Sequence, residues 1–127
     1  RAPMHCTGVG KLMLLNYDEE KLDNFIQSKG LPVLTPYTKV TREALLTELE
    51  NCRRQGYALD NEECEIGARC VAGPIRDYTG KVIAAISVSG PTSRMTLERT
   101  PAIIAAVKEI ATRISQKMAF EEKSPKD

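Results

Sequence analysis

Residues 68–89 read ARCVAGPIRDYTGKVIAAISVS, and this stretch predicts a β-hairpin. Two apolar segments, 68–75 and 82–89, flank the sequence RDYTGK. Within it, Asp77, Thr79 and Gly80 are residue types that favour a tight turn. The hairpin is therefore the element from which the rest of the fold can be built.

We expect Ile75 to pair with Val82, which sorts the strand residues onto two faces. One face is apolar and needs a helix laid over it; it holds Val71, Gly73 and Ile75 opposite Ile86, Ala84 and Val82. The other face is small and partly polar; it holds Ala68, Cys70, Ala72 and Pro74 opposite Ser89, Ser87, Ala85 and Ile83. Two hydroxyls and a thiol on small residues suit a small-molecule site, although such a face can also be solvated or tightly packed.

Apolar spacing predicts three helices before the hairpin. A short helix is expected over residues 8–17, where two glycines precede a dense apolar block. A second helix begins after the cap Asp18 and stops at Gly30. A third begins after the cap Thr41 and stops at Gly56.

The last element is expected to begin at Thr96 and to be a long helix, with a start near Thr100 if Pro101 is to fall in its first turn. Its apolar stripe is formed by Ile103, Val107, Ile110, Ile114 and Met118. It is the natural cover for the apolar face of the hairpin. A short strand is expected at residues 57–60, and the last residues, 121–127, form a polar tail. These elements indicate an α/β fold of the α+β type, in which helices flank a central antiparallel sheet.

The composition excludes several classes of protein. A length of 127 residues allows one domain, and 18 Lys and Arg against 17 Asp and Glu give a net charge of +1, too low to grip a DNA backbone. The longest uncharged apolar run, residues 82–89, is far too short to cross a membrane. The four cysteines do not make a disulfide scaffold, so we expect reduced thiols in a cytoplasmic protein.

The sequence HCTGVGK at residues 5–11 resembles a phosphate loop but lacks the required glycine and hydroxyl, because His5 and Leu12 hold those positions. Glycines at the start of a helix nevertheless leave backbone N–H groups near Gly8 and Val9 free to hold a small anion. A glycine turn needed only for packing is the alternative.

No cysteine pair has the spacing of a metal site, so we expect no metal and no cofactor. We expect no enzyme either, since a catalytic thiol needs a base and His5 is the one imidazole, adjacent to Cys6, although it could reach Cys70. Cys52 lies on the apolar stripe of its helix, so we expect it to be a residue of the hydrophobic core. Asp60, at a strand end, could point into a site.

A family resemblance covers nearly the whole chain, from about Ala2 to Phe120. The segments HCTGVGK, RRQGYALDNEE, GARCVAGPIRDYTGKVIAAISVSGP and SRMT together resemble the effector-binding half of IclR-type bacterial transcription regulators. The resemblance implies a GAF-like fold and a cytoplasmic, non-enzymatic regulator or repressor. Residues 1–120 would be the effector-binding domain, N-terminally incomplete and without its winged helix-turn-helix domain, followed by the tail 121–127.

Carried over from the family, the small-ligand site would use Gly8, Val9, Asp60, Cys70, Ser87 and Ser89. The position of Ala2 is often larger in the family, so this wall is expected to be more open. The implied partners are a small organic acid, DNA through the missing domain, no membrane, and a second copy in a homodimer or tetramer.

Within the family the chain is most similar to regulators of carbohydrate metabolism of the pectin-degradation type, which respond to 2-keto-3-deoxygluconate. The alternatives are a thiol redox or metal sensor that uses Cys64 and Cys70, or an oligomerisation module without a ligand.

Overall fold

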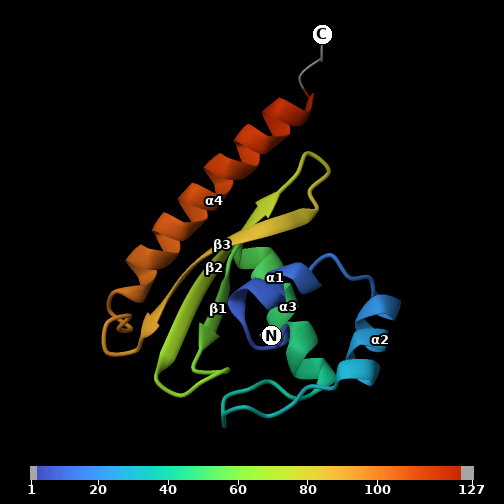
Figure 1. Ribbon diagram of the computed structural model, residues 1–127, viewed down its shortest axis with the longest axis vertical. Helices are drawn as coiled ribbons and strands as arrows, with labels where there is room; N and C mark the ends of the chain where they lie inside the picture. Colours follow the sequence, from blue (N-terminus) through green and yellow to red (C-terminus); the bar gives the residue numbers. More distant parts are fainter. Residues whose placement is uncertain (1–2, 124–127) are drawn as a thin grey trace.

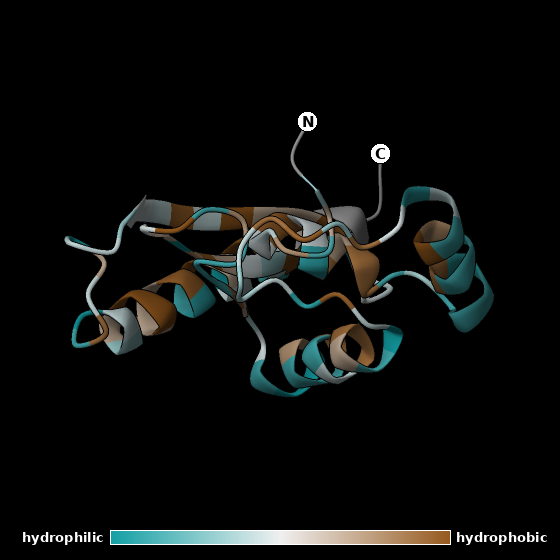
Figure 2. Ribbon diagram, turned by 90° about the horizontal axis from the view of Figure 1, so that it is seen from below, coloured by the Kyte–Doolittle hydropathy of each residue, from teal (hydrophilic) through white to brown (hydrophobic). Residues whose placement is uncertain are grey.

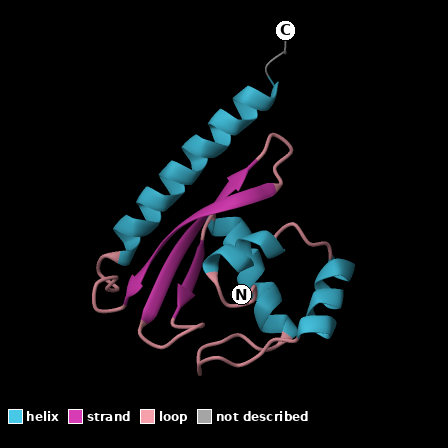
Figure 3. Cartoon of the chain, viewed as in Figure 1, coloured by secondary structure: helices cyan, strands magenta, loops and turns pink. Residues whose placement is uncertain are grey.

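The computed structural model describes residues 3–123, which form a central sheet with helices on both faces (Figures 1 and 3). The elements in chain order are α1 (Gly8–Leu14), α2 (Glu19–Lys29), α3 (Arg42–Gln55), β1 (Ala58–Asn61), β2 (Ala68–Arg76), β3 (Val82–Pro91) and α4 (Thr100–Lys123). The three strands are antiparallel in the order β1-β2-β3. The α+β architecture expected from the sequence is confirmed.

The two faces of the sheet are covered by different helices. Helix α4 lies on one face, where a core cluster includes Val71, Met95 and Val107. Helices α1 and α3 lie on the other face and contribute Leu12 and Cys52 to a second cluster, so Cys52 is a core residue as expected. Helix α2 packs outside this layer through a third cluster of leucines, and the helices show alternating polar and apolar bands (Figure 2).

The hairpin forms, but its register differs from the expected one. Ile75 pairs with Ala84 rather than Val82, and Cys70 pairs with Ser89 rather than Ser87. A bulge between Ile75 and Arg76 causes this shift, since Arg76 pairs with Val82. For residues 68–75 and 84–89 the two faces are as expected, because a shift of the pairing by two residues keeps each side chain on its face.

The bulge has one consequence for the core. The expected register places Val82 under the terminal helix, but Val82 is fully buried on the opposite face, in the cluster with Leu12 and Ala72. Asn16 holds this strand end in place, because its amide accepts from the N–H of Val82 at 2.9 Å and donates to its carbonyl at 2.7 Å. Helix α1 ends at Leu14 and not at residue 17, and the N–H groups of Leu15, Asn16 and Tyr17 bond three residues back in a tighter turn.

Helix α4 covers the apolar face, as expected, and approaches β2 closely at Gly73. A Cβ atom at Gly73 would lie 2.9 Å from Cβ of Ala111, so only glycine fits beneath the helix there. Ala111 takes the buried position expected for Ile110, which is 45% exposed. A helix this close to the sheet needs a small residue at the contact, which the spacing of the large apolar residues alone did not reveal.

The helix ends mostly follow the expected signals. Asp18 and Thr41 cap α2 and α3, and Gly56 ends α3 in the left-handed conformation. Helix α4 begins at Thr100, the start that Pro101 favours, because a missing N–H costs nothing in the first turn. It continues to Lys123, into the expected tail, and residues 124–127 lie outside the described residues. None of the described helices is long and apolar enough to span a membrane.

Candidate functional site

A cavity of about 480 Å³ lies between the start of α1 and the small face of the sheet. Its lining residues are Met4, Thr7, Gly8, Val9, Gly10, Met13, Cys70, Ser87 and Ser89. They come from α1 with the residues before it, from β2 and from β3, so the fold brings together segments far apart in the chain. Five of the six candidate ligand-binding residues, all except Asp60, line this one cavity.

The helical wall of the cavity presents backbone N–H groups. The hydroxyl of Thr7 accepts from the N–H of Gly10 at 3.1 Å, and the carbonyl of Thr7 accepts from the N–H of Lys11 at 2.9 Å. The N–H groups of Gly8 and Val9 come before these and have no acceptor within the helix. Gly10 must be glycine, because a Cβ there would lie 2.4 Å from Cα of Met4.

The sheet wall is built from small residues, which serve two purposes. A Cβ at Gly8 would lie 3.0 Å from Cβ of Ala72 and 3.3 Å from Sγ of Cys70, so small side chains allow α1 to pack tightly on β2. On the neighbouring strand β3, Ser87 and Ser89 are exposed and line the cavity. The small face is thus tightly packed under α1 and carries exposed hydroxyls beside it.

Two methionines in the cavity were not anticipated. Met4 and Met13 line it together with Val9, so the walls hold polar donors on an otherwise apolar surface. The sequence carried a weak signal for both, since each lies within five positions of the glycine pair at the start of α1. Flexible methionine side chains adapt to ligands of different shape. Ala2, the expected open wall, lies outside the described residues.

Asp60 does not line the cavity. It pairs with Cys70 across β1 and β2, which places it on the same face, but its side chain is buried beside the loop that follows β1. There its carboxylate accepts from the N–H of Glu63 at 2.9 Å. Burial raises the pKa of Asp60, helped by the charge of Glu63 and opposed by backbone hydrogen bonds. Its position therefore supports a turn rather than direct contact with a cavity ligand.

Lys11, the lysine of the glycine segment, is fully buried in an ion cluster. Its ammonium donates to the carboxylates of Glu48 at 2.6 Å and Glu63 at 3.0 Å, and to the carbonyl of Leu59 at 2.8 Å. Burial lowers the pKa of Lys11, but the two carboxylates outweigh that effect and the net shift is upward. The lysine is committed to tying α1 to α3 and β1 and does not reach for phosphate.

The thiol of Cys64 does not lie beside Cys70, as the redox alternative requires. The Sγ atom of Cys64 is 2.9 Å from that of Cys6, not beside Cys70. Burial is the main cause that raises the pKa of both thiols, and nearby Asp60 and Glu63 add to it. A raised pKa reduces the thiolate that reacts with oxidants, so the surroundings disfavour a rapid redox sensor.

The position of His5 and the arrangement of the ligand-type side chains bear on the catalytic and metal alternatives. Nε2 of His5 lies 2.9 Å from the carbonyl of Pro32, which anchors the residues before α1 to the loop after α2. His5 therefore does not act on Cys70. Among the side chains that the structure describes, those of residues 3–119, no group of three His, Cys, Asp or Glu is placed to hold a metal ion.

An α+β domain with a cavity between the start of a helix and a sheet face has the kind of concave surface that small-molecule sites use. Comparison with known proteins makes this specific. Residues 1–116 match the family described as bacterial transcriptional regulator IclR C-terminal, and the chain belongs to this family. It corresponds to the effector-binding C-terminal domain of IclR-type regulators.

Two relatives show the extent of the likeness. The chain is 43% identical over 115 residues to the HTH-type transcriptional repressor AllR of Escherichia coli K12, covering 91% of this chain and 42% of that protein. The same identity and coverage hold for AllR of Salmonella typhimurium. The chain thus spans less than half the length of these relatives, which are transcription regulators and not enzymes.

Solved structures give the same result. The C-terminal domain of Escherichia coli KdgR superposes with a TM-score of 0.82 and 38% identity, covering 94% of this chain and 73% of that one. The IclR protein of Thermotoga maritima has a TM-score of 0.82 and 36% identity, covering 93% of this chain and 48% of that one. An inducer-binding domain of PobR from Acinetobacter, in complex with 3-hydroxybenzoic acid, has a TM-score of 0.82 and 30% identity, covering 91% of this chain and 66% of that one.

Proposed function

We propose that the cavity beside α1 binds a small organic acid of the sugar-acid or keto-acid type, and that this binding controls DNA binding by a separate domain of the same regulator. The observation that carries the proposal is that backbone donors at Gly8 and Val9 line the same cavity as Ser87 and Ser89. These groups can hold a carboxylate and a neighbouring oxygen without any charged side chain.

The size and chemistry of the cavity narrow the ligand class. A volume of about 480 Å³ suits a metabolite of modest size. The methionines supply apolar contact for a carbon chain, while polar groups come from the start of α1 and from β3. A double mutant of the PobR inducer-binding domain, which shares the fold, forms a complex with 3-hydroxybenzoic acid, and this supports an acid as ligand here.

Control of DNA binding requires that the ligand prefers one state of the regulator. A ligand shifts an equilibrium only by its difference in affinity for the two states. Here the cavity wall is formed by two elements, α1 and the sheet, so a ligand between them favours the arrangement in which both sets of donors reach it. The pectin-degradation assignment and its 2-keto-3-deoxygluconate effector belong to this proposal.

The test is a thermal-shift and calorimetry screen of the purified protein against aliphatic keto acids, sugar acids, aromatic hydroxy acids and nucleotides. We expect an aliphatic acid to bind. Ser87→Ala with Ser89→Ala should weaken it by about tenfold, since each hydroxyl contributes roughly 0.5–1.5 kcal/mol. Ser93→Ala, an exposed serine outside the cavity, is the matched control and should leave the affinity unchanged.

Three outcomes contradict the proposal. Binding of nucleotides alone, or of aromatic acids alone, refutes the ligand class. No binding by any acid favours an oligomerisation module without a ligand. Equal weakening by the Ser93 control and by the cavity serines places the ligand elsewhere.

A further inference from the structure

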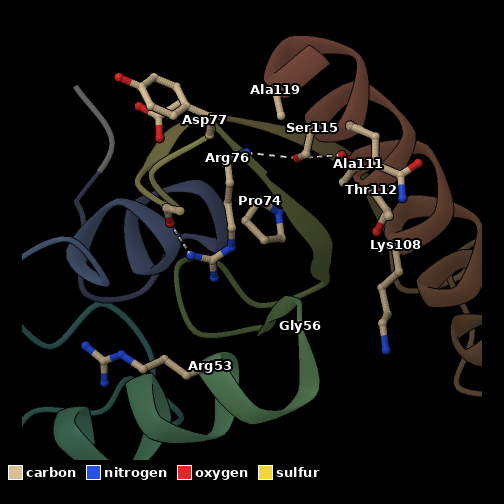
Figure 4. A pocket seen from close by; sticks show the side chains of 13 residues that line it. Arg53, Gly56, Pro74, Arg76, Asp77, Lys108, Ala111, Thr112, Ser115 and Ala119 are labelled. Carbon is tan, nitrogen blue, oxygen red and sulfur yellow. Dashed lines mark hydrogen bonds between the residues drawn. The ribbon is translucent and has the colours of Figure 1, made fainter. Parts of the chain in front are cut away.

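A second cavity, of about 510 Å³, lies away from the first, between the end of α3, the hairpin and α4 (Figure 4). Three cationic side chains from three different elements line it: Arg53 from α3, Arg76 from the end of β2 and Lys108 from α4. By contrast, no charged side chain lines the first cavity within the described residues. The two cavities are therefore suited to different ligands.

The three cations retain much of their capacity to bind a ligand. Arg76 donates one hydrogen bond to the carbonyl of Gly80 at 2.8 Å, and further N–H groups of its guanidinium remain. Arg53 donates to the carbonyl of Leu15 at 3.4 Å. Among the described side chains, those of residues 3–119, the one carboxylate within 4 Å of any of the three is Glu50, which is 3.6 Å from Arg53 and itself exposed. An exposed pair of this kind contributes little.

The ammonium of Lys108 is positioned by its surroundings rather than by a carboxylate. It lies 5.8 Å from the centre of the Tyr57 ring, and its chain passes over Gly56, where a Cβ would be 3.5 Å from Cε of the lysine. The carbonyls at the end of α3 carry a partial charge of about −0.5, which is small beside three full positive charges. The field in this cavity is therefore positive.

The acidic residue of this cavity does not cancel the field. Asp77 lines it, but its carboxylate accepts from the N–H groups of Thr79 at 2.9 Å and Lys81 at 3.2 Å and from the hydroxyl of Thr79. The hydrogen bonds from Thr79 are the main cause that lowers the pKa of Asp77. With Asp77 charged, the lining has three cations and one carboxylate, which leaves a net charge of +2.

We propose that this second cavity binds the phosphate group of a small phosphorylated metabolite. A phosphate monoester is close to a dianion at neutral pH and offers three acceptor oxygens for charged N–H donors. The charged ends of Arg53 and Lys108 point apart in Figure 4, so these long side chains must turn to reach one phosphate together with Arg76. Thr112 and Gln116 of α4 add uncharged polar groups, and Pro74 and Ala111 provide apolar surface for the rest of the molecule. A recess, rather than an extended basic stripe, selects a small molecule over nucleic acid.

A ligand here would join three elements of the fold. It would contact the end of α3, the hairpin and α4, and so hold α4 against the sheet in one position. Because α3 also carries Glu48, the partner of Lys11 on α1, the second cavity is connected through one helix to the wall of the first. Phosphate would then act as a second input beside the organic acid.

The experiment uses inorganic phosphate as the probe, with the purified protein at about pH 8, where the dianion prevails. Binding is followed by NMR of the arginine and lysine side chains and by calorimetry. We expect saturable binding that sulfate competes with and acetate does not. The double variant Arg53→Gln/Lys108→Gln should weaken the binding by about tenfold or more.

A matched control separates a site from a general charge effect. Arg54→Gln/Lys117→Gln removes the same charge from the same two helices, but neither residue lines the cavity. This control should weaken phosphate by less than about twofold. Melting temperatures confirm that each variant folds, and the single variant Lys108→Gln serves if the double variant does not.

Two results overturn the proposal. No saturable binding at tens of millimolar phosphate means that the cavity is not a site. Equal weakening by the two double variants means that phosphate senses net charge only. Raised ionic strength offers an independent check, because phosphate binding should weaken steeply while binding of the organic acid to the uncharged first cavity should change little.

Discussion

Substitution of Lys11 by methionine tests how the cluster beneath α1 is held together. The ammonium is fully buried and bonds to Glu48, Glu63 and the carbonyl of Leu59. Lys11→Met keeps the apolar stem but leaves a side chain of Glu63 that is 4% exposed without its main partner. Breaking a buried pair from one side costs about 3–5 kcal/mol.

For Lys11→Met we expect a cost at the lower end of this range. Glu48 is 15% exposed and can turn toward water, and Lys39 remains 3.4 Å from Glu63. We therefore expect a loss of about 3 kcal/mol in the free energy of unfolding at neutral pH. For a chain of this size that corresponds to a fall of roughly 10–15 °C in melting temperature.

The assay is denaturant unfolding at about pH 7 and about pH 4.5, with the exposed Lys29→Met as control. The raised pKa of Lys11 means that its contribution is fully present at neutral pH and is lost only as pH rises through the folded-state value. In the variant the buried carboxylate of Glu63 keeps only the longer contact with Lys39, and acid relieves its charge by protonation. The loss should therefore be smaller at the lower pH.

A second substitution completes the test. Lys11→Met/Glu63→Gln removes the stranded charge and should recover at least half of the loss, because a neutral amide is less costly to bury than a carboxylate. A loss below about 1 kcal/mol at neutral pH, or an equal loss at both pH values, refutes the claim that an unpaired charge is what destabilises the variant.

Three further predictions concern packing, titration and assembly. Gly73→Ala forces a methyl group against α4, 2.9 Å from Ala111, and should lower the free energy of unfolding by about 1–3 kcal/mol in denaturant titrations; no change would mean that α4 yields freely. Burial raises the pKa of Asp60, so its contribution to stability falls as pH rises from the ordinary aspartate value through the folded-state value; Asp60→Asn should gain stability relative to the parent as pH rises from acid to neutral, and a loss of stability over that rise would show that the charge is needed. The same variant should keep the acid affinity, whereas an altered preference among polyol acids would return Asp60 to the site. Finally, the chain should sediment as a homodimer at micromolar concentration, or as a tetramer, because a dimer matches a two-fold DNA site; a strict monomer with and without ligand counts against assembly through this domain.

Local signals in the sequence determined much of this domain. The caps Asp18 and Thr41 and the stop at Gly56 define helices through hydrogen bonds between near neighbours, so they were readable without the fold. The alternation along 68–89 likewise placed Cys70, Ser87 and Ser89 on one face, since strand periodicity depends on the backbone alone.

The tertiary structure decided what depends on distances between segments. The bulge after Ile75 set the register and moved Val82 to the other face. Because α4 approaches the sheet closely at Gly73, the small Ala111 is buried there and Ile110 is exposed. Both outcomes depend on how two surfaces fit, and a periodic pattern does not encode that fit.

The same distinction holds for the sites. The sequence singled out Gly8 and Val9 because a glycine pair before an apolar run exposes N–H groups. It did not show that Met4 and Met13 complete the cavity or that Asp60 turns into a buried loop. Nor did it show that Arg53 and Lys108, 55 positions apart, line one recess, because only the packing of α3 and α4 around the hairpin brings their charges together.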